Sequence, residues 1–242
     1  MPTDGLDSER FLGFIFETET AVALLGEGIG HIASCDGGDA RRTIALHLLA
    51  QGYERFLKVT HAVNQLSLEG ALPTSRQIRR EFGHVLTKLL DEIVAGCRSD
   101  STFISRPAIQ DDMDFLVADD HWREILDILS DLGSGGRYHD LDTMLDGEST
   151  WDSPLDRWKA LEMAYLSADP KWQELMESDP AKFARQWYPA LAAKQTETLQ
   201  RAARAIARMW TLGPAQPHAQ RLTGIIGRFL FIMDDDLRTP AT

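Results

Sequence analysis

The sequence has few of the features that mark membrane-spanning, disulfide-stabilised or cysteine-ligated metal proteins. Only two of its 242 residues are cysteines, Cys35 and Cys97, too few for a disulfide framework or a cysteine-rich metal cluster. Its longest apolar stretches, such as 21–25 and 229–233, fall far short of the roughly 20 residues that a membrane-spanning helix needs. We therefore expect no membrane span. The acidic N-terminal residues, unlike those of a secretory signal, favour a cytoplasmic protein.

Basic residues are also in the minority. The chain has 25 Lys and Arg against 37 Asp and Glu, a formal net charge of −12. Such a protein is not a sequence-blind binder of nucleic acid or of anionic membranes, because its overall field repels polyanions. Any polyanion must therefore bind at a local cluster of cations.

The motifs of several large enzyme classes do not occur. The chain lacks a Walker-type Gly-x4-Gly-Lys-Ser/Thr, a dinucleotide-binding Gly-x-Gly-x2-Gly after a strand and a Gly-x-Ser-x-Gly nucleophile elbow. Kinase, dehydrogenase and α/β-hydrolase classes are thereby disfavoured. The aspartates at 111, 112, 114, 119 and 120 offer oxygen ligands that suit magnesium, but their spacing matches no established metal-binding loop. We predict no metal site and no cofactor.

What the sequence does have is helical periodicity, because apolar residues recur every three or four positions without alternating strand-like runs. We expect an all-α chain whose first helix, from near Ser8, is weakened by glycines at 26, 28 and 30. Further helices are predicted near 40–68, 76–94, 107–117, 119–132, 154–166, 171–177, 180–210 and 217–233. The predicted organisation is a helical bundle core over 1–100, an irregular connection with short helices and a glycine-rich loop over 101–150, and C-terminal helices packed on the same core over 151–242.

The most promising chemical pattern lies on the predicted helix over 76–94, where Arg79 and Arg80 precede His84. On a continuous helix, His84 and Arg80 lie opposite the apolar face that contains Phe82. An imidazole can move the proton of a ribose 2′-hydroxyl or of a leaving group, and a guanidinium stabilises phosphorane charge, so these residues suit metal-free RNA cleavage. Arg79 is the first choice for the cation, and Arg80, at i and i+4 to His84, is the substitute. The spacing alone favours a solvated cationic helix face instead.

Two further pairs are candidate binding residues. Glu54 and Lys58 stand at i and i+4 on a predicted helix, where an ordinary surface ion pair contributes only a few tenths of a kcal/mol. If the pair faces His84, Glu54 can fix the imidazole tautomer, as carboxylates do beside catalytic histidines. Arg137 and Tyr138 follow a glycine run and could hold a phosphate and stack on a base. The structural alternative is that Arg137 pairs with acids and that Tyr138 packs into the bundle.

A second basic stripe is predicted on the long C-terminal helix. Arg201, Arg204 and Arg208 share one helix face. On an acidic protein these residues could contact RNA, a partner protein or the chain's own aspartates.

The segment 51–58, Gln-Gly-Tyr-Glu-Arg-Phe-Leu-Lys, followed by Arg79-x4-His84 within Phe-Gly-His-Val-Leu, resembles the HEPN superfamily of small helical bundles. Members pair a helix bearing Glu-x3-Lys with one bearing Arg, four to six residues and then His. The resemblance implies a metal-independent endoribonuclease site assembled across a homodimer, although other members bind or scaffold without catalysis. The Gly-His-x-Leu version is similar to abortive-infection-type and related uncharacterised bacterial proteins.

The residues and this resemblance together predict an all-α, HEPN-like antiparallel helical bundle with a C-terminal helical extension. The expected function is metal-independent RNA cleavage in a bacterial stress, toxin or phage-defence system. The expected partners are a second copy of the chain, RNA and a cognate antitoxin or other defence protein. The alternative is a non-catalytic helical interaction or nucleotide-binding module. The residues assigned to the site are His84, Arg79 and Arg80 for catalysis, and Glu54, Lys58, Arg137 and Tyr138 for binding.

Overall fold

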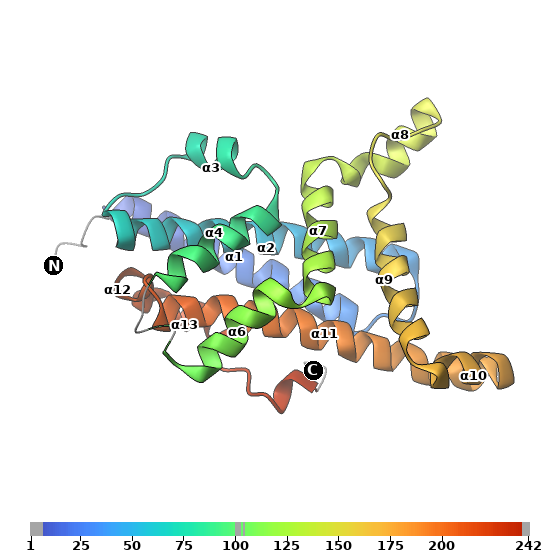
Figure 1. The fold of residues 1–242 in the computed structure, drawn as a ribbon. Helices are drawn as coiled ribbons and strands as arrows, with labels where there is room; N and C mark the ends of the chain where they lie inside the picture. The colour runs from blue at the N-terminus through green and yellow to red at the C-terminus, as the bar shows by residue number, and fades with distance from the viewer. Residues whose placement is uncertain (1–6, 100–102, 104, 239–242) are drawn as a thin grey trace.

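The computed structural model describes residues 7–99, 103 and 105–238, and it confirms the all-α class, since this part of the chain contains helices and no strand (Figure 1). None of the described helices combines the length and apolarity needed to cross a membrane. The α-helices are α1 (Ser8–Ala33), α2 (Asp39–Glu69), α3 (Ser75–Glu81), α4 (Leu86–Arg98), α6 (Pro107–Ala118), α7 (Asp120–Ser134), α8 (His139–Asp146), α9 (Pro154–Ala168), α10 (Pro170–Ser178), α11 (Pro180–Leu212), α12 (Gln216–Ala219) and α13 (Thr223–Leu230). Three short 3-10 turns are η1 (Gly136–Tyr138), η2 (Gln220–Leu222) and η3 (Asp236–Arg238).

The two longest N-terminal helices, α1 and α2, form a closely packed antiparallel pair (Figure 1). A Cβ atom at Gly28 would lie 2.8 Å from Leu49 Cγ, and one at Gly52 would lie 2.9 Å from Leu25 Cγ. Glycine is therefore required at both crossings, because a larger residue would force the helices apart. The expectation that glycines at 26, 28 and 30 weaken the first helix was wrong: α1 continues through them to Ala33, and Gly28 allows the close approach of α2.

The main core brings the N- and C-terminal helices together. It contains buried apolar side chains of α1, α2, α4, α6, α7, α11 and α13, together with Trp158 of α9. Two buried hydrogen bonds tie α11 to α2: the Tyr53 hydroxyl donates to the Leu199 carbonyl oxygen at 2.6 Å, and Trp210 Nε1 donates to Thr60 Oγ1 at 2.7 Å. These bonds satisfy the polar atoms of two large aromatic side chains, so both rings can be buried without an unpaired donor.

A smaller cluster closes the far end of α11, where α10 lies in Figure 1. Its buried members are Leu166, Trp172, Trp187 and Leu191. The start of α2 is joined to α9 nearby by a buried ion pair in which Arg42 Nε and Nη2 donate to Glu162 at 2.9 and 2.8 Å. Thus α9 to α11 are held to the bundle by an aromatic cluster and by charge.

The predicted single helix over 76–94 is divided into α3 and α4. Thr74 begins α3 with a capping box, as its sequence suggests, but the chain turns at Gly83, whose φ of 56° is left-handed. Phe82 is buried with its ring edge-on to His61 at 4.9 Å, and the Ser130 hydroxyl accepts the Leu86 N–H at 3.0 Å. The turn therefore places Phe82 in the core and gives the first amide of α4 a hydrogen-bond acceptor, although the helix is interrupted. The predicted helix over 217–233 is likewise divided into α12, η2 and α13.

Candidate functional site

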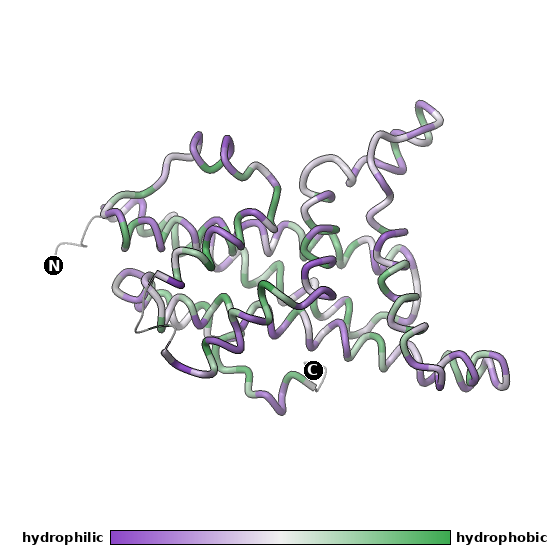
Figure 2. Tube along the Cα trace, viewed as in Figure 1, coloured by the Kyte–Doolittle hydropathy of each residue, from purple (hydrophilic) through white to green (hydrophobic). Residues whose placement is uncertain are grey.

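An open groove with a volume of about 890 Å³ lies among α1, α2 and α3, and Arg137 also contributes to its lining. Figure 1 shows α3 standing away from the helices beneath it, and Figure 2 shows that α3 is mostly hydrophilic. The cationic residues of the lining are Arg10, Arg55, Lys58, Arg79 and Arg137, whereas among the residues that the structure describes its acidic members are Glu17 and Glu54. This groove is a local concentration of positive charge on a protein with a net charge of −12.

The groove also has an apolar part. Phe14 of α1, Val59 and Ala62 of α2, Leu72 and Ile78 contribute to the same lining. A groove that combines apolar surface with several cations suits a ligand with both flat apolar and anionic parts, and nucleotides have this composition.

His84 is joined to this groove through Glu54. Its Nδ1 lies 3.0 Å from a carboxylate oxygen of Glu54, and Lys58 Nζ donates to the other carboxylate oxygen. Burial raises the pKa of the Glu54 carboxyl, but hydrogen bonds from Lys58 and His84 outweigh burial and hold that pKa below its ordinary value. Glu54 is therefore ionised, and because a carboxylate only accepts, Nδ1 carries the proton of this hydrogen bond. The other imidazole nitrogen, Nε2, has no hydrogen-bond partner among the described residues.

The position of His84 is fixed by the turn between α3 and α4 and by α7 behind it. Gly83 supplies the left-handed residue of the turn, and Ser130 of α7 holds the start of α4. A Cβ atom at Gly133 would lie 3.1 Å from His84 Cβ and 3.4 Å from its Nδ1. The His84 side chain is nevertheless 45% exposed, so a ligand can reach it.

We expect Gly133→Ala to displace the His84 ring, because the added methyl group would make a closer contact with it than side chains normally accept. Gly96→Ala in α4 is the matched control, since its added Cβ would meet Leu68 Cδ1 at an ordinary 3.5 Å. We expect Gly96→Ala to raise the free energy of unfolding by about 0.5–1 kcal/mol. Gly133→Ala should raise that free energy by less, and it should also shift the His84 ring signals in NMR spectra. Unchanged His84 signals in Gly133→Ala would contradict this packing.

The structure separates the two candidate arginines. Arg79 lines the groove, where its guanidinium donates to the backbone oxygen and hydroxyl of Ser75 on the same helix. Arg80 is not part of the lining; its exposed side chain pairs with Glu81. The predicted closeness of Arg80 to His84 depended on an unbroken helix, which the turn between α3 and α4 interrupts.

The Arg137–Tyr138 pair lies in η1, outside the hydrophobic core. Arg137 lines the groove, with its guanidinium carbon 4.9 Å from the centroid of the Tyr138 ring. Tyr138 is exposed and does not pack into the bundle as the structural alternative supposed. The structure therefore brings Glu54, Lys58, Arg79 and Arg137 to one groove, with His84 bonded to it and Tyr138 beside Arg137.

The arginines of the predicted second basic stripe contact other residues of the same chain. Arg204 is buried and donates to the Ile232 carbonyl and to Asp234, whereas Arg208 donates to Asp112 at 2.7 Å. The hydrogen bond from Arg204 lowers the pKa of Asp234. The guanidinium of Arg201 lies over the Phe115 ring at 4.2 Å. Of the alternatives, the pairing with the chain's own aspartates is the one observed for Arg204 and Arg208.

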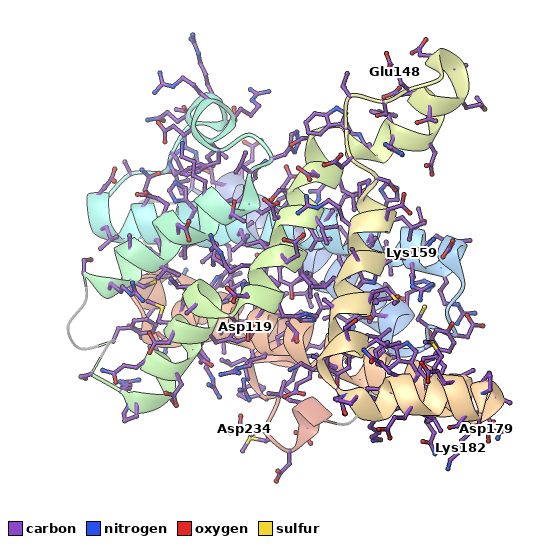
Figure 3. The ribbon with its side chains drawn as sticks, turned by 45° about the vertical axis from the view of Figure 1, so that its right-hand side comes forward. Asp119, Glu148, Lys159, Asp179, Lys182 and Asp234 are labelled. Atoms are coloured by element: carbon purple, nitrogen blue, oxygen red, sulfur yellow. The ribbon has the colours of Figure 1, made fainter. Side chains whose placement is uncertain are left out.

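Three of the five aspartates considered as metal ligands, Asp112, Asp114 and Asp119, have structural partners. Asp119 caps α7 by accepting the Trp122 N–H at 2.8 Å, and Asp114 lies 3.8 Å from Arg98. Asp119 and Asp234 come from separate elements (Figure 3). Over the described residues, no group of three or more His, Cys, Asp and Glu residues is arranged to hold a metal ion.

Sequence reasoning missed several residues of the groove, notably Arg10, Phe14 and Arg55. A signal was present on both long helices: the lining positions 10, 13, 14 and 17 of α1, and 51, 54, 55, 58, 59 and 62 of α2, follow helical spacing. The role of Gly133 had no local signal, because its contact with His84 joins residues far apart in the chain.

The chain matches no family model, no curated protein and no solved structure. Its function is therefore argued from the groove and from the His84–Glu54–Lys58 chain of hydrogen bonds.

Proposed function

We propose that this protein is a metal-independent endoribonuclease of a bacterial stress, toxin or phage-defence system, HEPN-like in its bundle and acting as a homodimer. The observation that carries the proposal is His84, half-exposed and oriented by ionised Glu54 beside a groove lined by five cations. An oriented imidazole next to cations is what phosphodiester cleavage without metal requires.

In this proposal Nε2 of His84 takes the proton of a ribose 2′-hydroxyl. The 2′-oxygen then bonds to the adjacent phosphorus, and the bond from phosphorus to the 5′-oxygen breaks. The leaving 5′-oxygen receives a proton from the imidazolium, so the products are a 2′,3′-cyclic phosphate and a free 5′-hydroxyl. Glu54 stabilises the imidazolium between the two proton transfers, because its carboxylate accepts the Nδ1 hydrogen bond.

The cations of the groove would bind the RNA backbone. Arg79 is assigned to the phosphorane charge, because it lines the groove and Arg80 does not. Arg137 would hold a neighbouring phosphate and the exposed Tyr138 would stack on a base. A local cationic groove resolves the conflict between RNA binding and the acidic composition of the whole chain.

The test is to incubate the full-length protein with structured and single-stranded RNAs in EDTA and to identify the product ends. We expect 2′,3′-cyclic phosphates with the unaltered protein and a rate about 10²–10⁴-fold lower with His84→Ala. His31→Ala on α1 is the control and should cleave normally. Failure of the unaltered protein to cleave any of these RNAs at high concentration would refute the proposal, as would full activity of His84→Ala.

One observation favours a second function, a non-catalytic module that binds a nucleotide, RNA or partner protein. His84 itself is not among the residues that line the groove, so a ligand can bind Arg10, Arg55 and Lys58 without touching the imidazole. A cognate antitoxin or other defence protein is a candidate partner. In this case, titration by fluorescence anisotropy would show RNA bound without products, with affinity unchanged by His84→Ala and lowered by Arg55→Ala.

A further inference from the structure

The α8 arm, which we define as residues 138–152, stands away from the rest of the molecule (Figure 1). None of the residues of α8 is buried. Leu141, Met144 and Leu145 are 46%, 71% and 67% exposed, and their i, i+3, i+4 spacing places them on one face of the helix. This stripe therefore lacks a partner within the described residues of its own chain. A helix of two turns is stable in water mainly when its apolar face packs against another surface, so we expect a partner from outside the chain.

The arm is also strongly acidic. Asp140 and Asp142 flank the apolar stripe on either side, Asp146 follows on the same helix, and Glu148 stands near the end of the arm (Figure 3). The segment 138–156 contains no Lys or Arg. The arm is therefore negatively charged where the groove is positively charged. Its apolar stripe corresponds to the apolar part of the groove.

The base of the arm is held so that the arm points outward. The Trp151 indole lies against Gly135 where a Cβ atom would otherwise be, and a Cβ atom at Gly136 would lie 2.8 Å from Pro154 Cγ. His139 Nδ1 donates to the Trp151 carbonyl oxygen at 2.7 Å, which joins the outgoing and returning segments. These contacts hold the two ends of the arm together at its base.

We propose that the α8 arm of one copy docks into the groove of a second copy, with Leu141, Met144 and Leu145 on the apolar lining and the arm's aspartates beside Arg10, Arg55 and Arg79. Apolar residues at i, i+3 and i+4 between charged neighbours are the pattern by which an amphipathic helix binds a hydrophobic groove. The proposal does not depend on ribonuclease activity.

The positions of arm and groove favour a reciprocal dimer. Helix α3, which borders the groove, and helix α8 stand out on the same side of the molecule (Figure 1). A surface that carries both a donor arm and an acceptor groove can pair with an identical surface about a two-fold axis, and such a contact closes without forming a filament. A docked arm covers the cations of the groove, so RNA and the arm compete for the same site, and the arm-docked dimer is distinct from the RNA-cleaving homodimer of the proposed function.

The first test measures the oligomeric state of the full chain by sedimentation velocity. We expect a dimer whose dissociation constant rises with salt concentration, because opposite charges meet in the interface. Met144→Glu and Leu145→Glu should raise that constant at least about tenfold. Met163→Glu on α9, another exposed methionine, is the control and should leave it unchanged. A monomer at all concentrations, or a dimer unaffected by the arm substitutions, would overturn the proposal.

The second test locates the arm directly. Met144→Cys in the arm is combined with Ala62→Cys in the groove, and the oxidised protein is separated on a non-reducing gel. We expect disulfide-linked dimers, which the single substitutions and the native Cys35 and Cys97 should not form. A disulfide confined to one chain would show that the arm enters its own groove, and the absence of any link would show that it enters neither.

Discussion

Glu162→Ala is expected to lower the free energy of unfolding by up to about 3–5 kcal/mol, because it leaves the buried Arg42 guanidinium with the exposed Asp39, 3.3 Å away, as its remaining counter-charge. Glu162 accepts two hydrogen bonds from Arg42 and one from Trp158 Nε1 at 3.0 Å. Burial lowers the pKa of Arg42, but the hydrogen bonds and charge of Glu162 outweigh it and raise that pKa above its ordinary value. Without Glu162 burial is the main influence on that pKa and lowers it, but a guanidinium is not deprotonated in proteins, so Arg42 stays charged and the desolvation penalty is not relieved by losing a proton.

Chemical denaturation of the full chain measures this effect, with exposed Glu174→Ala on α10 as a control expected to change stability by no more than about 0.5 kcal/mol. The double variant Arg42→Met with Glu162→Leu should recover much of the loss, since no buried charge then lacks a partner. A cost below about 1 kcal/mol for Glu162→Ala would mean that water reaches the guanidinium and that the pair is not the junction between α2 and α9.

Helices α9, α10 and α11 were predictable because their N-terminal boundaries are encoded locally. Pro154, Pro170 and Pro180 each occupy the first turn of a helix, and Ser153, Asp169 and Asp179 each cap one by accepting a backbone N–H. The break between α3 and α4 was not predictable in this way. It depends on Ser130, which is 44 positions from Leu86, and on Phe82 finding a place in the core. A tertiary contact thus overrides a continuous helical pattern.

The part of the candidate site that lies on a single helix was predictable from the sequence. Glu54 and Lys58 pair as their spacing indicates, and they face His84, the condition on which their proposed role depended. The placement of Arg137 beside residues of α1, α2 and α3 could not be read from the sequence, because it depends on how α7 and η1 pack on the bundle. The charge pattern alone also could not choose among the alternatives for Arg204, whose buried pairing with Asp234 depends on the position of the chain after α13.

Glu54→Gln is expected to reduce RNA cleavage about 10–100-fold under the proposed function, as removal of the partner that orients a functional histidine commonly does. The amide can present its NH₂ group to Nδ1, which would favour the other tautomer and place the proton on Nε2, where the mechanism needs a base. Glu54 is thus a positioning residue that acts through His84. The reduction should fall on kcat with little change in KM, because the cations that would bind RNA remain.

The same substitution tests the structure independently of cleavage. The pKa of Glu54 lies below its ordinary value in the folded protein, so the stability that this carboxylate contributes is complete above the unfolded pKa, near 4.5, and is lost as pH falls through the lower folded pKa. Urea denaturation from pH 3 to 7 should therefore show a smaller acid-side loss of stability in Glu54→Gln than in the unaltered protein. Glu17→Gln, which removes the other groove carboxylate, should leave the His84 tautomer seen by ¹⁵N NMR unchanged, whereas Glu54→Gln should alter it. If the tautomer is the same in both variants, Glu54 does not orient His84, and any loss of cleavage must come from the charge of the groove.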